Sequence, residues 1–282
     1  GWLATSQAYV ADVTDEEGRA KGMGILGAAF GLGFIIGPAL GGYLAGKGVV
    51  NYQLPMLIAA AGSAIAFIIS VILLREPERY KNSVPSVVSF LPRMRGIPIL
   101  LVLIFLYFGL FFVFSGMEST FALWCDRMLE MGPRQVGYYL AFAGIVGVIV
   151  QGGLVGRLVP IFGETKVVIF GLICLAIGLA GLPSVSIEIW LLLPIGLLSV
   201  GFGFSNPSLQ SLISRAAPND MRGGTMGVAQ SMNSLGRITG PAWAGIAFIH
   251  LGVSWPFYSG AALVIPILLA SILLSRRVRY DV

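Results

Sequence analysis

The sequence predicts an all-α polytopic membrane protein. Hydrophobic residues make up 56% of the 282 residues and charged residues only 11%, which is too little charge to cover the surface of a soluble protein of this size. The apolar residues also gather into runs of about 20 residues or more with at most one Asp, Glu, Lys or Arg each, the length that a helix needs to cross a bilayer. A membrane β-barrel would instead show alternating strands of about ten residues.

Eight runs qualify as membrane-spanning helices, and short polar segments separate them. In chain order they cover residues 22–46, 53–74, 97–124, 136–156, 167–187, 189–212, 224–250 and 254–275. The sequence begins at Gly1 without the basic segment and cleavage site of a signal peptide. Residues 1–13 are interpreted as the end of a further span, so that the sequence is expected to be a fragment of a longer protein.

Basic residues collect on one side of the predicted membrane. With the loops placed alternately on the two sides, one side carries 14 of the 18 Lys and Arg residues, and the other carries only Lys47, Arg127 and Arg134. The positive-inside rule makes the basic side cytoplasmic and places the C-terminus there. This arrangement explains the net charge of +5. The lipid bilayer is therefore the expected partner of the basic residues, and no nucleic-acid partner is expected.

An internal repeat relates two parts of the chain at an offset of 203 residues. The sequence GPALGG at 37–42 aligns with GPAWAG at 240–245. Two copies with the same orientation indicate parallel repeats related by an axis along the membrane normal. The register also aligns Gln7 with Gln210, Arg19 with Arg222, Met23 with Met226, Gly24 with Gly227 and Gly33 with Gly236.

The offset also predicts the domain organisation. The second half starts near Ile97, so about a hundred residues, or about three spans, are expected to be missing from the front. The intact protein would then have twelve spans in two six-helix bundles. Residues 1–74 are assigned to the remainder of the N-terminal bundle, 75–96 to a cytoplasmic linker, and 97–282 to the C-terminal bundle.

Glycines are unusually frequent in the span that contains GLGFIIGPALGG, residues 31–42. Gly33, Gly37 and Gly41 are four residues apart and share one helix face, where small residues let two membrane helices approach closely. Pro38 bends the helix because it removes one backbone hydrogen bond. The pattern fits a static packing seam, and it also fits a seam that opens and closes.

The fifth-span signature of the proton antiporters of the major facilitator superfamily is filled at every fixed position by Gly24, Gly33, Gly37, Pro38, Gly41 and Gly42. The whole sequence resembles this superfamily, from the end of span four through span twelve. Within the superfamily it is most similar to the twelve-span drug:proton antiporters, in the branch that includes the tetracycline exporters.

This resemblance implies the major facilitator fold and a monomeric secondary transporter in the cell inner (plasma) membrane. The implied activity is the export of small amphipathic compounds in exchange for protons by alternating access, with the glycine-rich helix sealing the outer side. The energy source would be a proton gradient, with no cofactor. An importer or facilitator of a metabolite such as a sugar or organic acid remains the alternative.

An enzyme is not expected. The sequence shows no nucleophile–base pair, no metal-ligand set and no phosphate-binding loop: His250 is the single histidine, and Cys125 and Cys174 lie at different depths. The segment GMGILG at 22–27 matches G-x-G-x-x-G, but it opens a spanning helix after a charged turn, so a dinucleotide site is not predicted.

Two charged residues lie within predicted spans, Glu118 and Arg237. Intramembrane charges are costly and usually functional, so we expect one or both to contact the substrate or to couple to protons. Glu118 has the alternative of reaching the outer interface. Five polar side chains are candidates to line the same cavity or to form interhelical hydrogen bonds, namely Gln151, Asn206, Gln210, Gln230 and Asn233.

Candidate residues of a cytoplasmic gate are Asp12, Arg19 and Arg222, which lie at the cytoplasmic ends of their spans. The loop GRLVPIFGETK at 156–166 resembles a degenerate second copy of the superfamily's loop signature. Pro160-Ile161 replace the acidic–basic pair of that signature, so its charge-relay role is not expected here.

Overall fold

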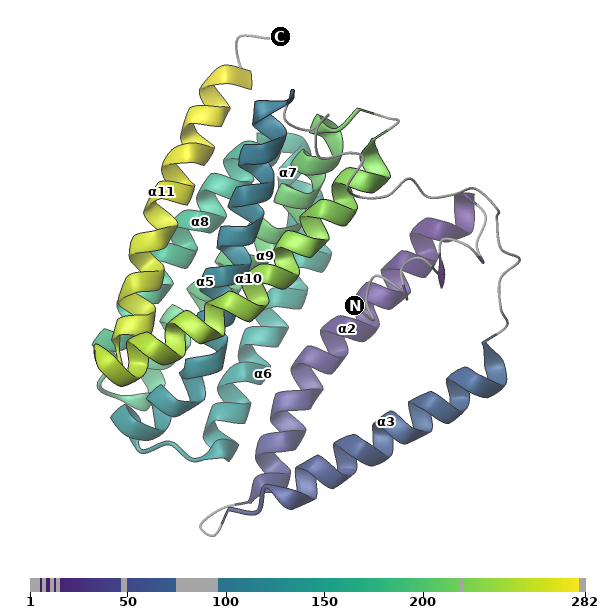
Figure 1. Ribbon diagram of the computed structural model, residues 1–282. Coiled ribbons are helices and arrows are strands. Elements are labelled where there is room, and N and C mark those ends of the chain that lie inside the picture. The colour runs from purple at the N-terminus through teal and green to yellow at the C-terminus, as the bar shows by residue number, and fades with distance from the viewer. Residues whose placement is uncertain are drawn as a thin grey trace. The chain divides into compact units, whose positions relative to one another are not determined.

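The computed structural model describes residues 6, 9–10, 13, 16–46, 50–74, 96–218 and 221–278. Every regular element in these ranges is a helix, which confirms the all-α prediction (Figure 1). The helices form two compact units. The first contains α2, α3 and Gly132–Gly144, and the second contains α5 and the described residues from Ile145 onward.

The first unit is built on two long helices, α2 (Glu16–Ala45) and α3 (Gln53–Leu73). They meet at the connection between them and diverge from there (Figure 1). α3 has no buried residue, although most of its side chains are large and apolar. An apolar surface of this extent is stable only against lipid or further membrane helices.

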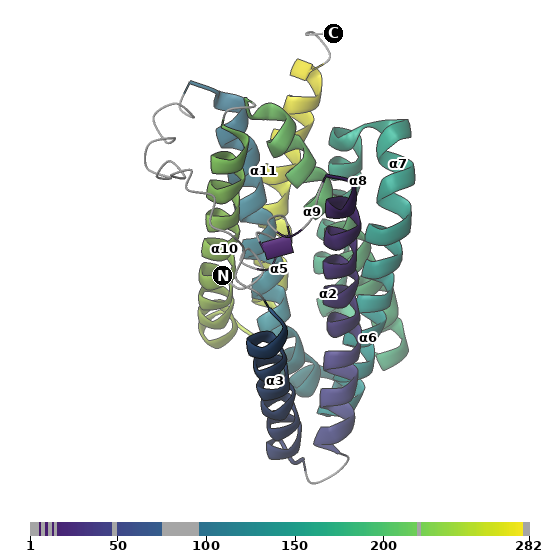
Figure 2. The same cartoon turned by 90° about the vertical axis from the view of Figure 1, so that its right-hand side faces the viewer.

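One continuous helical segment runs from Pro133 to Phe162 and changes its winding in the middle. It consists of α6 (Pro133–Ile149), a π-helical turn η1 (Val150–Leu154) and α7 (Val155–Phe162). The first part of α6 lies beside α2 in the first unit (Figure 2). The sequence predicted a single span at 136–156 and gave no sign of the π turn.

The second unit is a bundle of long helices that run side by side (Figure 1). α5 packs against α9, α10 and α11, and α8 packs against α9 and α11. The short 3₁₀ turns η2 (Leu182–Ser184) and η3 (Glu188–Leu191) connect α8 to α9. The long helices are α5 (Pro98–Leu129), α8 (Glu164–Gly181), α9 (Leu192–Ala216), α10 (Arg222–His250) and α11 (Trp255–Val278).

Glycines let these helices approach closely. A Cβ built on Gly201 of α9 would lie 2.7 Å from the carbonyl oxygen of Gly171 on α8. A Cβ on Gly116 of α5 would lie 3.1 Å from the carbonyl oxygen of Gly240 on α10. Because lipid provides no hydrophobic drive between helices, such close backbone packing is a main source of bundle stability in a membrane.

All eight predicted spans are helical, with ends that shift by up to six residues from the predicted ones. In the described part of the chain, seven helical segments are long and apolar enough to cross a bilayer. α10 is not among these seven, although it has 29 residues. It is the more polar helix because it carries Gln230, Asn233 and Arg237.

Candidate functional site

A network of polar side chains lies inside the second unit, at the junction of α5 and α9. The hydroxyl of buried Tyr107 donates to Oδ1 of Asn206 at 3.2 Å and accepts from Nε2 of Gln210 at 2.8 Å. Gln210 also donates to Asn206 Oδ1 at 3.0 Å. The three side chains therefore form an interhelical hydrogen-bond network, one of the two roles that the sequence left open for Asn206.

Asn233 extends this network to a third helix. Its side chain reaches the Tyr107 hydroxyl from α10 and is only 6% exposed. Among the described residues its Oδ1 atom has no hydrogen-bond partner. Gln230, nearly one turn earlier, is half-buried, and in the described part of the chain its side chain forms no hydrogen bond with Tyr107. The structure thus places Asn233 in the network and leaves Gln230 outside it.

Glu118 and Arg237 lie on the surface of the second unit, on α5 and α10. Both side chains are exposed although both helices are of membrane-spanning length. Within the described residues they form no ion pair, but the charge of Arg237 attracts the Glu118 carboxylate. The structure therefore places the two predicted intramembrane charges on neighbouring helices of one unit, where the charge of Arg237 acts on Glu118.

Gln151 occupies the π-helical turn η1, and its side chain is exposed. The neighbouring Val150 is buried against Val167 and Phe204, so the turn is anchored on one side. Single π turns inside α-helices are frequent at functional sites because they alter the direction in which a side chain points. The sequence identified Gln151 as a candidate but missed the altered winding around it.

Aromatic side chains continue from the polar network along α5 and α9. Tyr107 makes an edge contact with Phe111 at 5.1 Å between ring centroids, and Phe111 does so with Phe202 at 5.3 Å. Phe114 stacks on Phe202 at 3.9 Å. Polar and aromatic groups thus lie next to each other, the combination that an amphipathic molecule needs. The sequence analysis did not single out these aromatic residues.

The residues of the glycine signature differ in their contacts. A Cβ on Gly42 would lie 2.6 Å from the carbonyl oxygen of Pro133 and 3.1 Å from Cα of Gly137, both on α6. At Gly33, Gly37 and Gly41 no described atom lies within 4 Å of such a Cβ. In the described chain the tight helix contact is therefore made by Gly42, next to the face that the spacing predicted.

The second copy of the signature shows the opposite pattern. A Cβ on Gly236 would lie 2.8 Å from the carbonyl oxygen of Phe108 on α5, and Gly240 is pressed against Phe112 and Gly116 of the same helix. At Gly245, which aligns with Gly42, no described atom lies within 4 Å. The predicted glycine seam is therefore formed in the second copy, between α10 and α5.

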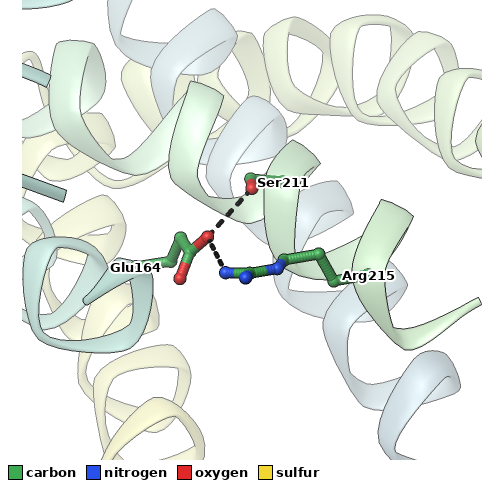
Figure 3. A network of polar contacts seen from close by, with 3 residues as sticks. All are labelled: Glu164, Ser211 and Arg215. Carbon is green, nitrogen blue, oxygen red and sulfur yellow. Dashed lines mark hydrogen bonds and ion pairs between the residues drawn. The ribbon is translucent and has the colours of Figure 1, made fainter. Parts of the chain in front are cut away.

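An ion pair joins α8 and α9 at the end that the sequence assigns to the cytoplasm (Figure 3). The Glu164 carboxylate accepts from Nη1 of Arg215 at 2.5 Å and from Ser211 Oγ at 3.1 Å. Glu164 lies in the first turn of α8, where a negative charge is favourable. The sequence analysis missed this pair, although the acidic residue directly after Gly163 was a usable signal of a helix start.

The predicted gate residues are only partly described. Asp12 and the side chain of Arg19 lie outside the described part of the chain. The contacts of Gly24 also lie outside it. Arg222 is exposed, and its Nε donates to the backbone oxygen of Ser214 at 3.0 Å. Arg222 therefore links the start of α10 to the last turns of α9.

No group of three His, Cys, Asp or Glu side chains in the described ranges is arranged to hold a metal ion. Cys125 and Cys174 are both buried and free. The chemistry of the described residues thus centres on hydrogen bonds, two intramembrane charges and aromatic contacts.

Comparison with known proteins gives a consistent picture. The model of the Major Facilitator Superfamily matches residues 2–241 and, a second time, residues 152–281. Multidrug resistance protein 2 of Bacillus subtilis (strain 168) is 34% identical over 267 residues, covering 92% of this chain and 65% of the relative. Tetracycline resistance protein, class C, of Escherichia coli is 28% identical over 270 residues, covering 92% and 67%.

A similar fold is found in the crystal structure of the human organic anion transporter MFSD10 (TETRAN). It matches with a TM-score of 0.68 and 23% identity over 95% of this chain and 67% of that one. At this identity the match supports the fold alone. The chain spans about two thirds of the length of the proteins that it matches.

Proposed function

The chain belongs to the major facilitator superfamily, and from this premise we propose that the full-length protein exports small amphipathic compounds in exchange for protons. Relatives of this chain include multidrug, tetracycline and quinolone resistance proteins. Membership of this family supports transport of a small molecule by a multi-pass membrane protein rather than catalysis. The compound, the proton coupling and the direction are our proposal.

The observation that carries the proposal is the exposure of Glu118 and Arg237 on helices of membrane-spanning length. Lipid does not solvate such charges, and charged residues in membrane helices face a water-filled cavity or another part of the protein. An aqueous cavity beside α5 and α10 accounts for both. The exposed side chain of Gln151 fits the same environment.

In this cavity Glu118 would exchange a proton for the substrate. Its carboxylate is protonated when no substrate is bound and releases the proton when the substrate enters. Arg237, whose charge already acts on Glu118, stabilises the carboxylate during that exchange. The aromatic contacts of Phe111, Phe114 and Phe202 offer a surface for the apolar part of the substrate.

Alternating access requires a seal that opens on each side of the membrane in turn. The Gly42–Gly137 contact between α2 and α6 is the candidate outer seal, because the antiporter signature supplies Gly42 and Pro38 there. The distribution of basic residues supports our proposal that this end lies outside and the C-terminus in the cytoplasm, in the cell inner (plasma) membrane. We expect the protein to work as a monomer.

The test uses the full-length protein in inverted membrane vesicles with an acid interior and a pH-sensitive dye. Addition of drugs, tetracyclines included, is expected to dissipate the pH gradient only in vesicles that contain the protein. Glu118→Gln should abolish this drug-dependent proton flux. Asp126→Asn, a matched change on the same helix at an exposed position, should retain it.

Two results would contradict the proposal. No response across a broad drug panel, followed by uptake of labelled sugars or organic acids, would identify an importer or facilitator. Unchanged flux in both Glu118→Gln and Arg237→Gln would remove these two residues from the coupling mechanism, even if drugs are exported.

A further inference from the structure

A cleft lies at the end of α2 and the start of α6, within the first unit. Its volume is about 510 Å³, in the range of sites that hold small molecules and head groups. Gly46 and Val50 line one side, and the first residues of α6, including Arg134 and Gln135, line the other. Among the described residues that line the cleft, Arg134 contributes a positive charge and none is a carboxylate.

Arg134 is held in a fixed orientation at this cleft. Its Nε–H donates to the hydroxyl of Tyr138 at 2.9 Å. Its guanidinium carbon lies 4.8 Å from the ring centroid of Tyr43 on α2 and 5.8 Å from that of Tyr138 on α6. Because two rings from two helices hold the group, little conformational freedom is left for it to lose on binding a ligand.

The two terminal nitrogens of this guanidinium remain available. They carry four N–H donors, and in the described part of the chain Arg134 forms no ion pair and no further hydrogen bond. A planar guanidinium binds two oxygens of one anion in parallel, most effectively those of a phosphate or carboxylate. Arg134 is half-buried, and its free donors therefore fit an anionic ligand.

The surroundings of Arg134 favour a phosphate at the membrane surface. Tyr43, Tyr52 and Tyr138 gather at this end of the first unit, and tyrosines concentrate where lipid head groups meet water. The cleft lies beyond the ends of the apolar stretches of α2 and α3, at the level of those head groups.

We propose that Arg134 and this cleft bind the phosphate of a phospholipid in the outer leaflet. Only the assignment to the outer leaflet rests on the topology of the proposed function. The cleft adjoins the contact between Gly42 and Gly137, because Tyr43 follows Gly42 directly and Arg134 lies one turn before Gly137. A bound lipid therefore touches both α2 and α6 next to their contact. The lipid composition of the membrane then influences how that contact opens.

The experiment is native mass spectrometry of the delipidated full-length protein, titrated with dioleoylphosphatidylglycerol. We expect Arg134→Gln to weaken the binding of one lipid by about ten-fold, the loss of roughly one charge-assisted bidentate contact. Arg127→Gln is the matched control: Arg127 is also assigned to the outer side, lies 5.2 Å from the ring of Phe248, and is not one of the residues that line the cleft. It should bind lipid like the unaltered protein. Equal lipid binding by all three proteins would overturn the proposal.

Further arms identify the source of the phosphate. Dioleoylglycerol, which lacks the phosphate, should bind no more tightly to the unaltered protein than to Arg134→Gln. Inorganic phosphate in large excess should leave the lipid bound; displacement by it would overturn the lipid assignment in favour of a free anion. Arg134→Lys keeps the charge without the bidentate geometry and should bind with intermediate affinity, which protects the test if Arg134→Gln fails to fold. Binding is measured without transport, so failure of the export proposal leaves this result standing.

Discussion

Gly42 on α2 and Gly137 on α6 meet backbone to backbone. A Cβ built on Gly137 would lie 2.5 Å from the carbonyl oxygen of Pro38 and 3.2 Å from Cα of Gly42. Any larger side chain at either position must push the helices apart, because the nearest atoms belong to the backbone. The contact therefore depends on the absence of a side chain at Gly42 and Gly137.

Gly42→Val is expected to lower transport by about ten-fold, since overpacking a tight contact costs about 1–3 kcal/mol. The measurement is drug-dependent proton flux divided by the amount of inserted protein. Gly27→Val is the control on the same helix, where no described atom lies within 4 Å of the new Cβ. Equal flux in the two variants would show that the close contact is unimportant for transport.

Deletion of Gly152 is expected to remove the π turn and leave the rest of the helix in place. A π turn contains one extra residue within an α-helix, so the deletion restores regular winding without turning α6 and α7 relative to each other. The variant should fold, with its melting temperature little changed, but transport should fall because Gln151 changes direction. Gly152→Ala keeps the chain length and should retain transport. A fully active deletion variant would make the π turn dispensable.

Tyr107→Phe is expected to lower the free energy of unfolding by about 1–2 kcal/mol, because Asn206 and Gln210 lose their shared partner inside the bundle. Thermal unfolding in detergent, followed by circular dichroism, measures the change. Tyr258→Phe at an exposed position should have almost no effect. If the two variants unfold alike, the network contributes nothing measurable to stability.

The ion pair between Glu164 and Arg215 is expected to contribute about 0.5–1 kcal/mol, because the Arg215 side chain is 71% exposed and well screened by water. A double-mutant cycle with Glu164→Gln and Arg215→Gln isolates this coupling energy. High salt should reduce the coupling. A coupling energy near zero at low salt would assign the stabilising role of Glu164 to its hydrogen bond with Ser211 and its position at the start of α8.

Hydropathy and spacing were sufficient to predict the helices. Each span is a long apolar run, and the repeat at an offset of 203 residues fixed how the two copies of the glycine signature correspond. The polar character of α10 was also visible in the sequence through Gln230, Asn233 and Arg237. These properties depend on one segment at a time, which is why a single sequence reveals them.

Pairings between distant segments were not predictable in the same way. The partner of Asn206 is Tyr107, and the partner of Glu164 is Arg215; neither follows from periodicity, because both depend on how the helices turn in the bundle. The spacing predicted the contact face on Gly33, Gly37 and Gly41. The contact is instead made by Gly42, one residue further along, because the rotation of the helix decides which of its glycines meets a neighbouring helix. The π turn has no sequence signature beyond a pair of glycines.

The glycine contacts of the two repeat copies are complementary. Among the described residues, α10 uses Gly236 and Gly240 against α5 but makes no close contact at Gly245, whereas α2 uses Gly42 against α6 but makes none at Gly33 and Gly37. Two aligned copies of one glycine pattern therefore pack against their neighbours through different positions. Among the described residues, a larger side chain is blocked by backbone atoms at Gly236 but not at the aligned Gly33, and at Gly42 but not at the aligned Gly245. The same substitution at corresponding positions of the two copies should therefore have opposite effects on helix packing.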